Sequence, residues 1–191
     1  MKKIRFIHIS DVLLGTNVDS DMPWADERKK EIYGTFEKII DRADRTDVDF
    51  MFISGNLFDH QPSVEELSWL DEVLGRLKST EVIYSAGFCD NLGGETPLMT
   101  YRFSSRVYVL GTPLFTENPS ENMTVFRDEQ ATMAMDHLHF PEKNMDVYGV
   151  SYFDGRMDAH AIDETYPDDG AVHNVLVACG GGRHRMPIDW N

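Results

Sequence analysis

The pattern of apolar and polar positions predicts short strands that alternate with helices in the first part of the chain. The run Phe50–Ser54 has almost no polar position, as in a strand that is buried on both faces. Ile4–Ile9, Glu81–Tyr84 and Val107–Leu110 are predicted as further strands. With a helical pattern after each of the first two strands, this order predicts a largely parallel sheet.

Two helices are predicted between these strands. The first is expected to begin with Ser20 or Asp21 as its N-cap and Pro23 in its first turn, because apolar residues follow at helical spacing. The second is expected to begin at Ser63, where Glu66 completes a capping-box pattern. Each helix has one apolar stripe and a charged opposite face, which is typical of a helix that packs on a sheet.

The second half of the chain has a different pattern. Met123–Phe126, Thr132–Leu138 and Val147–Tyr152 are predicted as strands with short connections, which favours antiparallel pairing. Val175–Ala178 is predicted as a last buried strand. Residues 154–170 are acidic and rich in turn-forming residues, so they predict a solvent-exposed loop whose spacing does not fit an EF-hand.

Length and charge narrow the class of protein. A chain of 191 residues can form one domain with a substantial core, so residues 1–191 are predicted to be a single domain. No apolar run approaches the ~20 residues of a membrane span, and the first ten residues lack a signal-peptide cleavage site, so we expect a cytoplasmic protein. The formal net charge of −15 argues against nucleic-acid binding, because such a surface repels phosphates.

Small and polar residues follow the buried strands abruptly. The segments Ser10–Leu13, Gly55–Asp59 and Gly87–Asp90 come directly after three predicted strands, and Cys179 follows the last one. Ligands of open α/β sheets bind at the carboxyl ends of the strands. These segments are therefore predicted to form one site.

In their order, these segments resemble the motifs of the calcineurin-like metallophosphoesterases, and among them those of the SbcD-type DNA-repair exonucleases. The stretches IRFIHISDVLLG, ISGNLFD, VYGVSYFDG and NVLVACGG carry the resemblance, which extends over nearly the whole chain. It implies an α/β fold, a metallophosphoesterase-like sandwich of two mixed sheets flanked by helices. In this family two divalent metals such as manganese orient a phosphodiester and bind the attacking hydroxide.

Carried over to the first two motifs, the resemblance implies that metal ligands are missing. Asp11 matches the aspartate of the family's DxH motif, but Leu13 stands at its histidine. Asn56 stands at the bridging aspartate of GDxxD, and Asp59 matches the second aspartate of that motif. A neutral amide is a poor bridge between two dications, because it offers one ligand oxygen and no negative charge.

The later motifs are degenerate as well. Phe88 and Cys89 stand at the metal-binding asparagine and the catalytic histidine of the GNH motif, and Asp90 is the acidic residue that follows. Cys179 stands at the histidine of the HG motif. The family's closing GHxH motif has no counterpart, so we expect a domain that lacks the last strands and any capping domain.

We therefore expect a catalytically inactive phosphoesterase-like protein without a cofactor, whose site is packed shut by residues such as Leu13 and Phe88. Two alternatives remain open. In the first, Cys89, Cys179 and Asp11 bind zinc, or the two cysteines form a redox pair. In the second, a phosphodiesterase or DNA exonuclease retains activity with an altered manganese site.

Loss of the last strands predicts an exposed sheet edge, and exposed edges invite pairing with another chain. We expect a homodimer or a protein partner at this edge. Because SbcD-type enzymes work with an ATPase of the SMC type, the resemblance implies an analogous partner.

His137 and His139 form an HxH pair, which is a second candidate metal site. Residues two apart on a strand share a face, so the two rings can converge. Since no third ligand is evident nearby in the sequence, two surface or half-buried histidines are the favoured interpretation.

Overall fold

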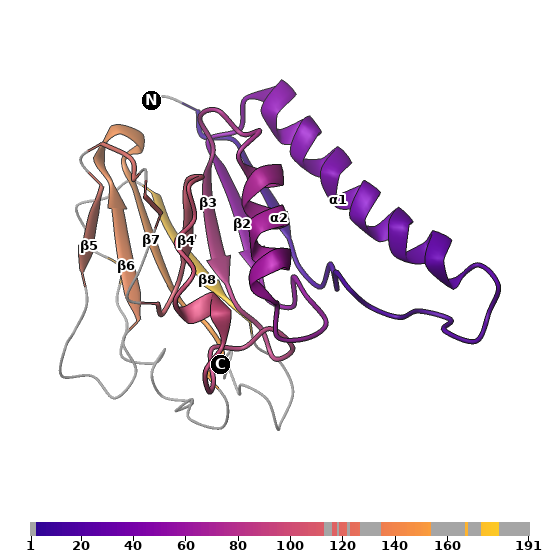
Figure 1. Cartoon of the computed structure of the whole chain (residues 1–191). Helices are drawn as coiled ribbons and strands as arrows, with labels where there is room; N and C mark the ends of the chain where they lie inside the picture. The colour runs from indigo at the N-terminus through magenta and orange to yellow at the C-terminus, as the bar shows by residue number, and fades with distance from the viewer. Residues whose placement is uncertain are drawn as a thin grey trace, which may run out of the picture.

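The computed structural model describes residues 3–112, 116–117, 119–121, 123–126, 135–153, 167 and 173–179. These residues form two four-stranded sheets (Figure 1). The first contains, in spatial order, β1 (Phe6–Ile9), β2 (Phe50–Ser54), β3 (Glu81–Ser85) and β4 (Val107–Val109). The second contains β5 (Thr124–Phe126), β6 (Asp136–Phe140), β7 (Met145–Val150) and β8 (His173–Ala178).

Strand direction differs between the two sheets. All the neighbours in the first sheet are parallel, with Phe6 opposite Phe50 and Phe50 opposite Glu81. In the second sheet β5, β6 and β7 are antiparallel, as the short connections predicted, and β8 is parallel to β7. The expectation of two mixed sheets is therefore wrong for the first sheet, where each connection crosses back before the next strand begins.

The helices α1 (Ala25–Thr46) and α2 (Val64–Leu74) contribute to a core on one face of the first sheet. The predicted capping box of α2 is present, since Ser63 Oγ accepts from the Glu66 N–H at 3.2 Å. The predicted start of α1 is wrong: Trp24 is its N-cap residue, without a side-chain cap. Neither of these two described helices is long and apolar enough to cross a membrane.

Two tight turns precede α1, so the helix begins later than predicted. The Met22 N–H donates to the Asp19 carbonyl at 2.8 Å, and the Ala25 N–H donates to the Met22 carbonyl at 3.1 Å. These bonds hold the segment before the helix in tight turns, and the helical ladder begins only afterwards. Candidate capping residues such as Asp21 are therefore left in the turn region.

A second core lies between the two sheets, which therefore face each other. Phe50 meets Phe140 edge-on across this core, with ring centroids 5.2 Å apart. The buried residues of this core come from both sheets: Phe50, Phe52, Ile83, Tyr108, Leu110, Leu138, Phe140, Met145, Val147 and Val177. The arrangement of a helix layer and two facing sheets is consistent with part of a metallophosphoesterase fold.

Strand ends in the second sheet differ from the predicted ones. β6 extends beyond the predicted end at Leu138 to Phe140, because the inward-facing alternation continues through that ring, which is 3% exposed. Residues 132–134 of the predicted strand lie outside the described residues. β7 begins at Met145 and ends at Val150, earlier than predicted. Apart from Pro167, the predicted loop 154–170 lies outside the described residues.

Candidate functional site

The predicted strand-end segments form one continuous surface. Beyond the strands, the Asp11 N–H donates to the Gly55 carbonyl at 3.1 Å, and the Gly55 N–H donates to the Ser85 carbonyl at 2.8 Å. The Leu13 N–H donates to the Asn56 carbonyl at 3.1 Å. Asp11, Leu13 and Asn56 have φ angles of 50°, 55° and 48°, in the left-handed region that costs side chains energy. The ladder of the first sheet thus continues into its sharply bent loops.

The side chain of Asn56 joins the first and third of these loops. Its Nδ2 donates to Asp11 Oδ1 at 2.8 Å, and its Oδ1 accepts from the Cys89 N–H at 3.0 Å. A β-carbon at Gly87 would overlap the Asn56 side chain, so the glycine leaves the space that the amide uses. Both polar atoms of the amide are therefore engaged within the site.

This geometry does not fit a pair of bridged metal ions. A bridging carboxylate turns two negative oxygens toward the cations, whereas Asn56 turns an N–H donor toward Asp11. The Leu13 side chain has no atom that can bind a metal. We therefore derive no catalytic step through metals at this site.

Contrary to the expectation, Phe88 does not fill a closed pocket. Its side chain is 41% exposed, and its ring meets Tyr152 edge-on with centroids 5.6 Å apart. The turn that carries it is fixed by its neighbours, because Asn56 holds the Cys89 N–H and Asp90 holds the Gly87 N–H. The turn thereby leaves the ring at the surface of the rim.

Cys179 lies against the backbone of the second loop. A β-carbon at Gly55 would overlap its sulfur, so the pair packs without space for another group. Burial raises the pKa of the Cys179 thiol to about 11, and the nearby carboxylates of Asp11 and Asp90 add to this effect. Cys89 lies near enough to contribute as well, but no disulfide joins the two cysteines. Cys179 is consequently a neutral thiol at physiological pH.

Asp90 is a structural carboxylate rather than an available ligand. It is completely buried, and its Oδ1 accepts from the Gly87 N–H at 2.7 Å. Its Oδ2 accepts from the Phe58 N–H at 3.2 Å and from the Tyr84 hydroxyl. Burial, together with the Asp90 charge, raises the pKa of Tyr84 well above its usual value. Asp90 therefore ties the second loop to the third.

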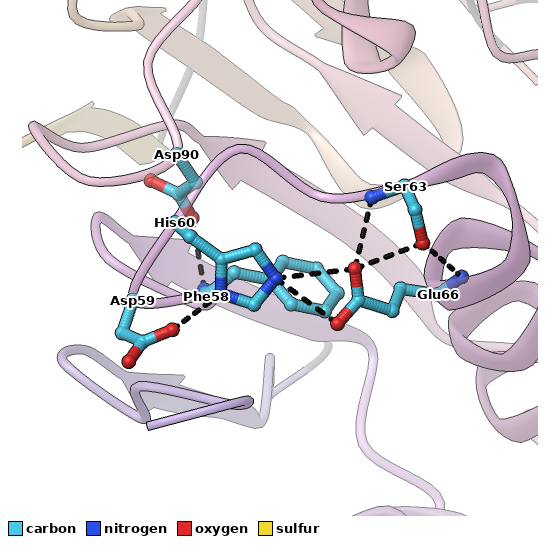
Figure 2. A network of polar contacts seen from close by, with 6 residues as sticks. All are labelled: Phe58, Asp59, His60, Ser63, Glu66 and Asp90. Carbon is cyan, nitrogen blue, oxygen red and sulfur yellow. Dashed lines mark hydrogen bonds and ion pairs between the residues drawn. The ribbon is translucent and has the colours of Figure 1, made fainter. Parts of the chain in front are cut away.

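Asp59 belongs to a network that sequence reasoning missed (Figure 2). His60 Nδ1 bonds Asp59 Oδ1, and His60 Nε2 lies 3.0 Å from Glu66 Oε1. Glu66 also accepts from the Ser63 N–H at 2.9 Å. A β-carbon at Gly15 would overlap the His60 ring, which places the first loop against the same imidazole. The signal in the sequence was a histidine between an acidic residue and a capping-box glutamate.

The two carboxylates control the charge of this imidazole. The hydrogen bond with Asp59 raises the pKa of His60, while burial opposes it and the bond with Glu66 adds to the rise. Burial tends to raise the pKa of Glu66, but hydrogen bonds from Ser63 and His60 outweigh it and lower that pKa. The network therefore favours the protonated form of His60 and the ionised form of Glu66.

His137 and His139 share a face of β6, as predicted, and both contact one carboxylate. Asp146 Oδ1 lies 3.0 Å from His137 Nε2 and 2.6 Å from His139 Nδ1, and Asp146 is 2% exposed. The His137 ring stacks on Tyr148 with centroids 4.3 Å apart. These contacts explain the pair as half-buried partners of a buried aspartate.

In the part of the chain that the structure describes, no three His, Cys, Asp or Glu side chains are arranged to hold a metal ion. This part includes Asp11, Cys89 and Cys179, the ligands of the zinc alternative. It also includes both members of the HxH pair. A zinc site with those cysteines would need a ligand from outside the described residues.

Comparison with known proteins gives a partial match. No protein-family model matches the chain. Over 80 residues it is 35% identical to the DNA double-strand break repair protein Mre11 of Saccharolobus solfataricus. The match covers 41% of this chain and 20% of that protein, so the chain spans about a fifth of the length of the curated relative. The resemblance to the calcineurin-like metallophosphoesterases of the SbcD type is thus confirmed as a distant, partial similarity to Mre11.

Proposed function

We propose that this chain is a degenerate metallophosphoesterase-like protein that does not hydrolyse phosphodiesters and acts by binding or assembly. The Asn56 amide carries the proposal, because its bonds to Asp11 and to the Cys89 N–H hold the first and third loops together. They stabilise the site without a cation.

The remaining ligand positions support the same function. Leu13 cannot bind a metal, and Cys179 stays protonated at neutral pH because its pKa is raised to about 11. A metal must displace that proton before the sulfur binds it. Since each position weakens the site independently, restoring one of them is expected to leave the protein inactive.

We place the binding role in a DNA-repair assembly, reached through protein contacts. The similarity to a DNA double-strand break repair protein supports this assignment. The net charge of −15 favours a protein over DNA as the direct contact. An exposed sheet edge favours a homodimer or a protein partner, and the resemblance implies an ATPase of the SMC type as that partner.

Elemental analysis after exposure to manganese and to zinc tests the proposal, together with an assay on bis(p-nitrophenyl) phosphate. We expect neither stoichiometric metal nor hydrolysis. Two bound manganese ions with hydrolysis would overturn the proposal. One zinc ion, lost in Cys89→Ser and in Cys179→Ser, would replace it with a rebuilt thiolate site.

A further inference from the structure

The outer edge of β1 has no partner strand among the described residues. β1 is the first strand of its sheet and pairs only with β2 there. The Arg5 carbonyl accepts from the Phe50 N–H at 3.3 Å, and the Asp11 N–H donates to Gly55. Because backbone groups alternate in direction along a strand, those of Phe6 and His8 point to the outer edge. This edge is a template for another strand.

A groove of about 540 Å³ borders this edge on the helix side. It separates the end of β1 from residues 28–39 of α1, and the beginning of α1 stands away from the sheet in Figure 1. Its apolar lining consists of Ile9, Val12, Ile32, Phe36 and Ile39. A strand added to β1 would direct every second side chain into this groove.

On the opposite face, β1 exposes an aromatic ring. Phe6 is 59% exposed and meets Phe52 edge-on, with centroids 5.5 Å apart. The second sheet leaves it uncovered, since β8 makes its contacts with the first sheet mainly through β2 and β3. The remaining side chains of an added strand would lie beside Phe6 and His8.

The charge of the chain favours one kind of segment at the β1 edge and groove. The charged side chains that line the groove, Arg28 and Glu31, bond each other at 2.7 Å, so the lining itself is close to neutral and the charge of the whole chain decides. With a net charge of −15, the chain attracts a cationic segment more strongly than a second copy of itself or nucleic acid.

We propose that the β1 edge and the adjoining groove bind an extended, positively charged segment of another protein, which adds a strand to the first sheet. Aliphatic side chains of the segment enter the groove at Ile32, and the segment's backbone pairs with Phe6 and His8. The proposal names a kind of partner for the binding role proposed above. It rests on the geometry of the edge and holds equally if the chain proves to be catalytic.

Short synthetic peptides test it with the full chain. The probe alternates valine and lysine, its counterpart alternates valine and glutamate, and a third peptide is N-methylated on the pairing edge. We expect the lysine peptide to bind about tenfold more tightly than the glutamate peptide and N-methylation to abolish binding. Amide hydrogen exchange should slow at Phe6 and His8 on binding, while Ile7 and Ile9, whose amides face β2, should change little.

Matched variants locate the site. Ile32→Lys should weaken binding of the lysine peptide about tenfold or more, whereas Val64→Lys, at an exposed apolar position on α2, should leave it unchanged. Circular dichroism checks that both variants fold. Absence of binding at about 1 mM peptide, equal binding of the two charged peptides, or indifference to Ile32→Lys would overturn the proposal. A dimer that Ile32→Lys dissociates in sedimentation equilibrium would assign the groove to a second copy instead.

Discussion

Asn56 Nδ2 donates a hydrogen bond of 2.8 Å to Asp11 Oδ1, where the resemblance to the metallophosphoesterases implies a bridging carboxylate. Two carboxylates at this separation repel each other unless a cation lies between them. An amide removes the repulsion and adds a charge-assisted hydrogen bond. An amide at position 56 therefore stabilises this contact without a metal ion.

Asn56→Asp should destabilise the protein in the absence of divalent metal. The change removes the hydrogen bond to Asp11 and brings two carboxylates together, with an expected cost of about 1–3 kcal/mol in the free energy of unfolding. It should not produce phosphodiester hydrolysis, because Leu13 and Phe88 remain. Urea unfolding in the presence of a chelator measures the first effect, and the phosphodiester assay measures the second.

Asn17→Asp is the matched control for charge, since Asn17 is exposed in the loop after β1. It should leave the unfolding free energy within about 0.5 kcal/mol of the parent. Equal stability of Asn56→Asp and the parent would show that the Asn56 bond is unimportant. Strong hydrolysis by Asn56→Asp would contradict the proposal that the protein is catalytically inactive.

Alkylation of Cys179 should keep accelerating as the pH rises from 8 to 10. Burial, with the Asp11 and Asp90 charges, raises the pKa of this thiol to about 11, and only the thiolate reacts with iodoacetamide. Asp11→Asn should speed the reaction at pH 8, because it removes a negative charge that opposes thiolate formation. Mass spectrometry of the peptide that contains Cys179 follows the rate, and a plateau below pH 9 would contradict the raised pKa.

Local sequence signals were sufficient for the elements that position the site. The apolar run that forms β2 has the predicted bounds, since no alternative period competes with it. The cap at Ser63 was also predicted, because the capping box uses only residues within one turn. The start of α1 was not, since Ser20 and Asp21 favour turns as readily as helix caps.

The contacts within the site depended on the relative position of distant segments. The order of the motifs predicted that Asp11 and Asn56 lie on one rim, but the direction of the amide follows from its two partners, the Asp11 carboxylate and the Cys89 N–H. The exposure of Phe88 follows from hydrogen bonds that fix its turn. The role of His60 becomes evident only in the structure, where Glu66 lies beside its Nε2.

Asp71→Ala should be among the more destabilising substitutions outside the core. Asp71 is 8% exposed and accepts from Ser104 N–H at 2.8 Å and Ser105 N–H at 2.9 Å, and from both serine hydroxyls. Loss of the carboxylate leaves donors unsatisfied, so we expect a cost of about 2–3 kcal/mol in unfolding free energy. Urea unfolding measures it, with Glu72→Ala, an exposed position on the same helix, as the control.

The Asp71 carboxylate also makes the free energy of unfolding depend on pH in the acid range. Burial favours the neutral form of Asp71, but the bonds from Ser105 and Ser104 outweigh it and lower its pKa below 3.8. A lowered pKa in the folded state gives stability that is present above the ordinary pKa and is lost as the pH falls through the folded value. In Asp71→Ala the free energy of unfolding should therefore fall less steeply than in the parent below about pH 4. An equally steep fall in the variant and the parent would contradict this role.

His60 should give stability with the opposite dependence on pH. Its hydrogen bond with Asp59 raises its pKa above 6.5, so the folded state binds its proton more tightly than the unfolded chain. That contribution is complete below pH 6.5 and is lost as the pH rises through the folded value. Because the side chain is 43% exposed, solvent screening limits the effect to less than about 1 kcal/mol.

Urea unfolding at pH 6 and pH 8 should show a smaller difference in unfolding free energy for His60→Gln than for the parent. His8→Gln, for which no carboxylate contact is described, serves as the histidine control. If His60→Gln keeps the full difference, the proton is held elsewhere and the network in Figure 2 serves only to fix the loop against α2.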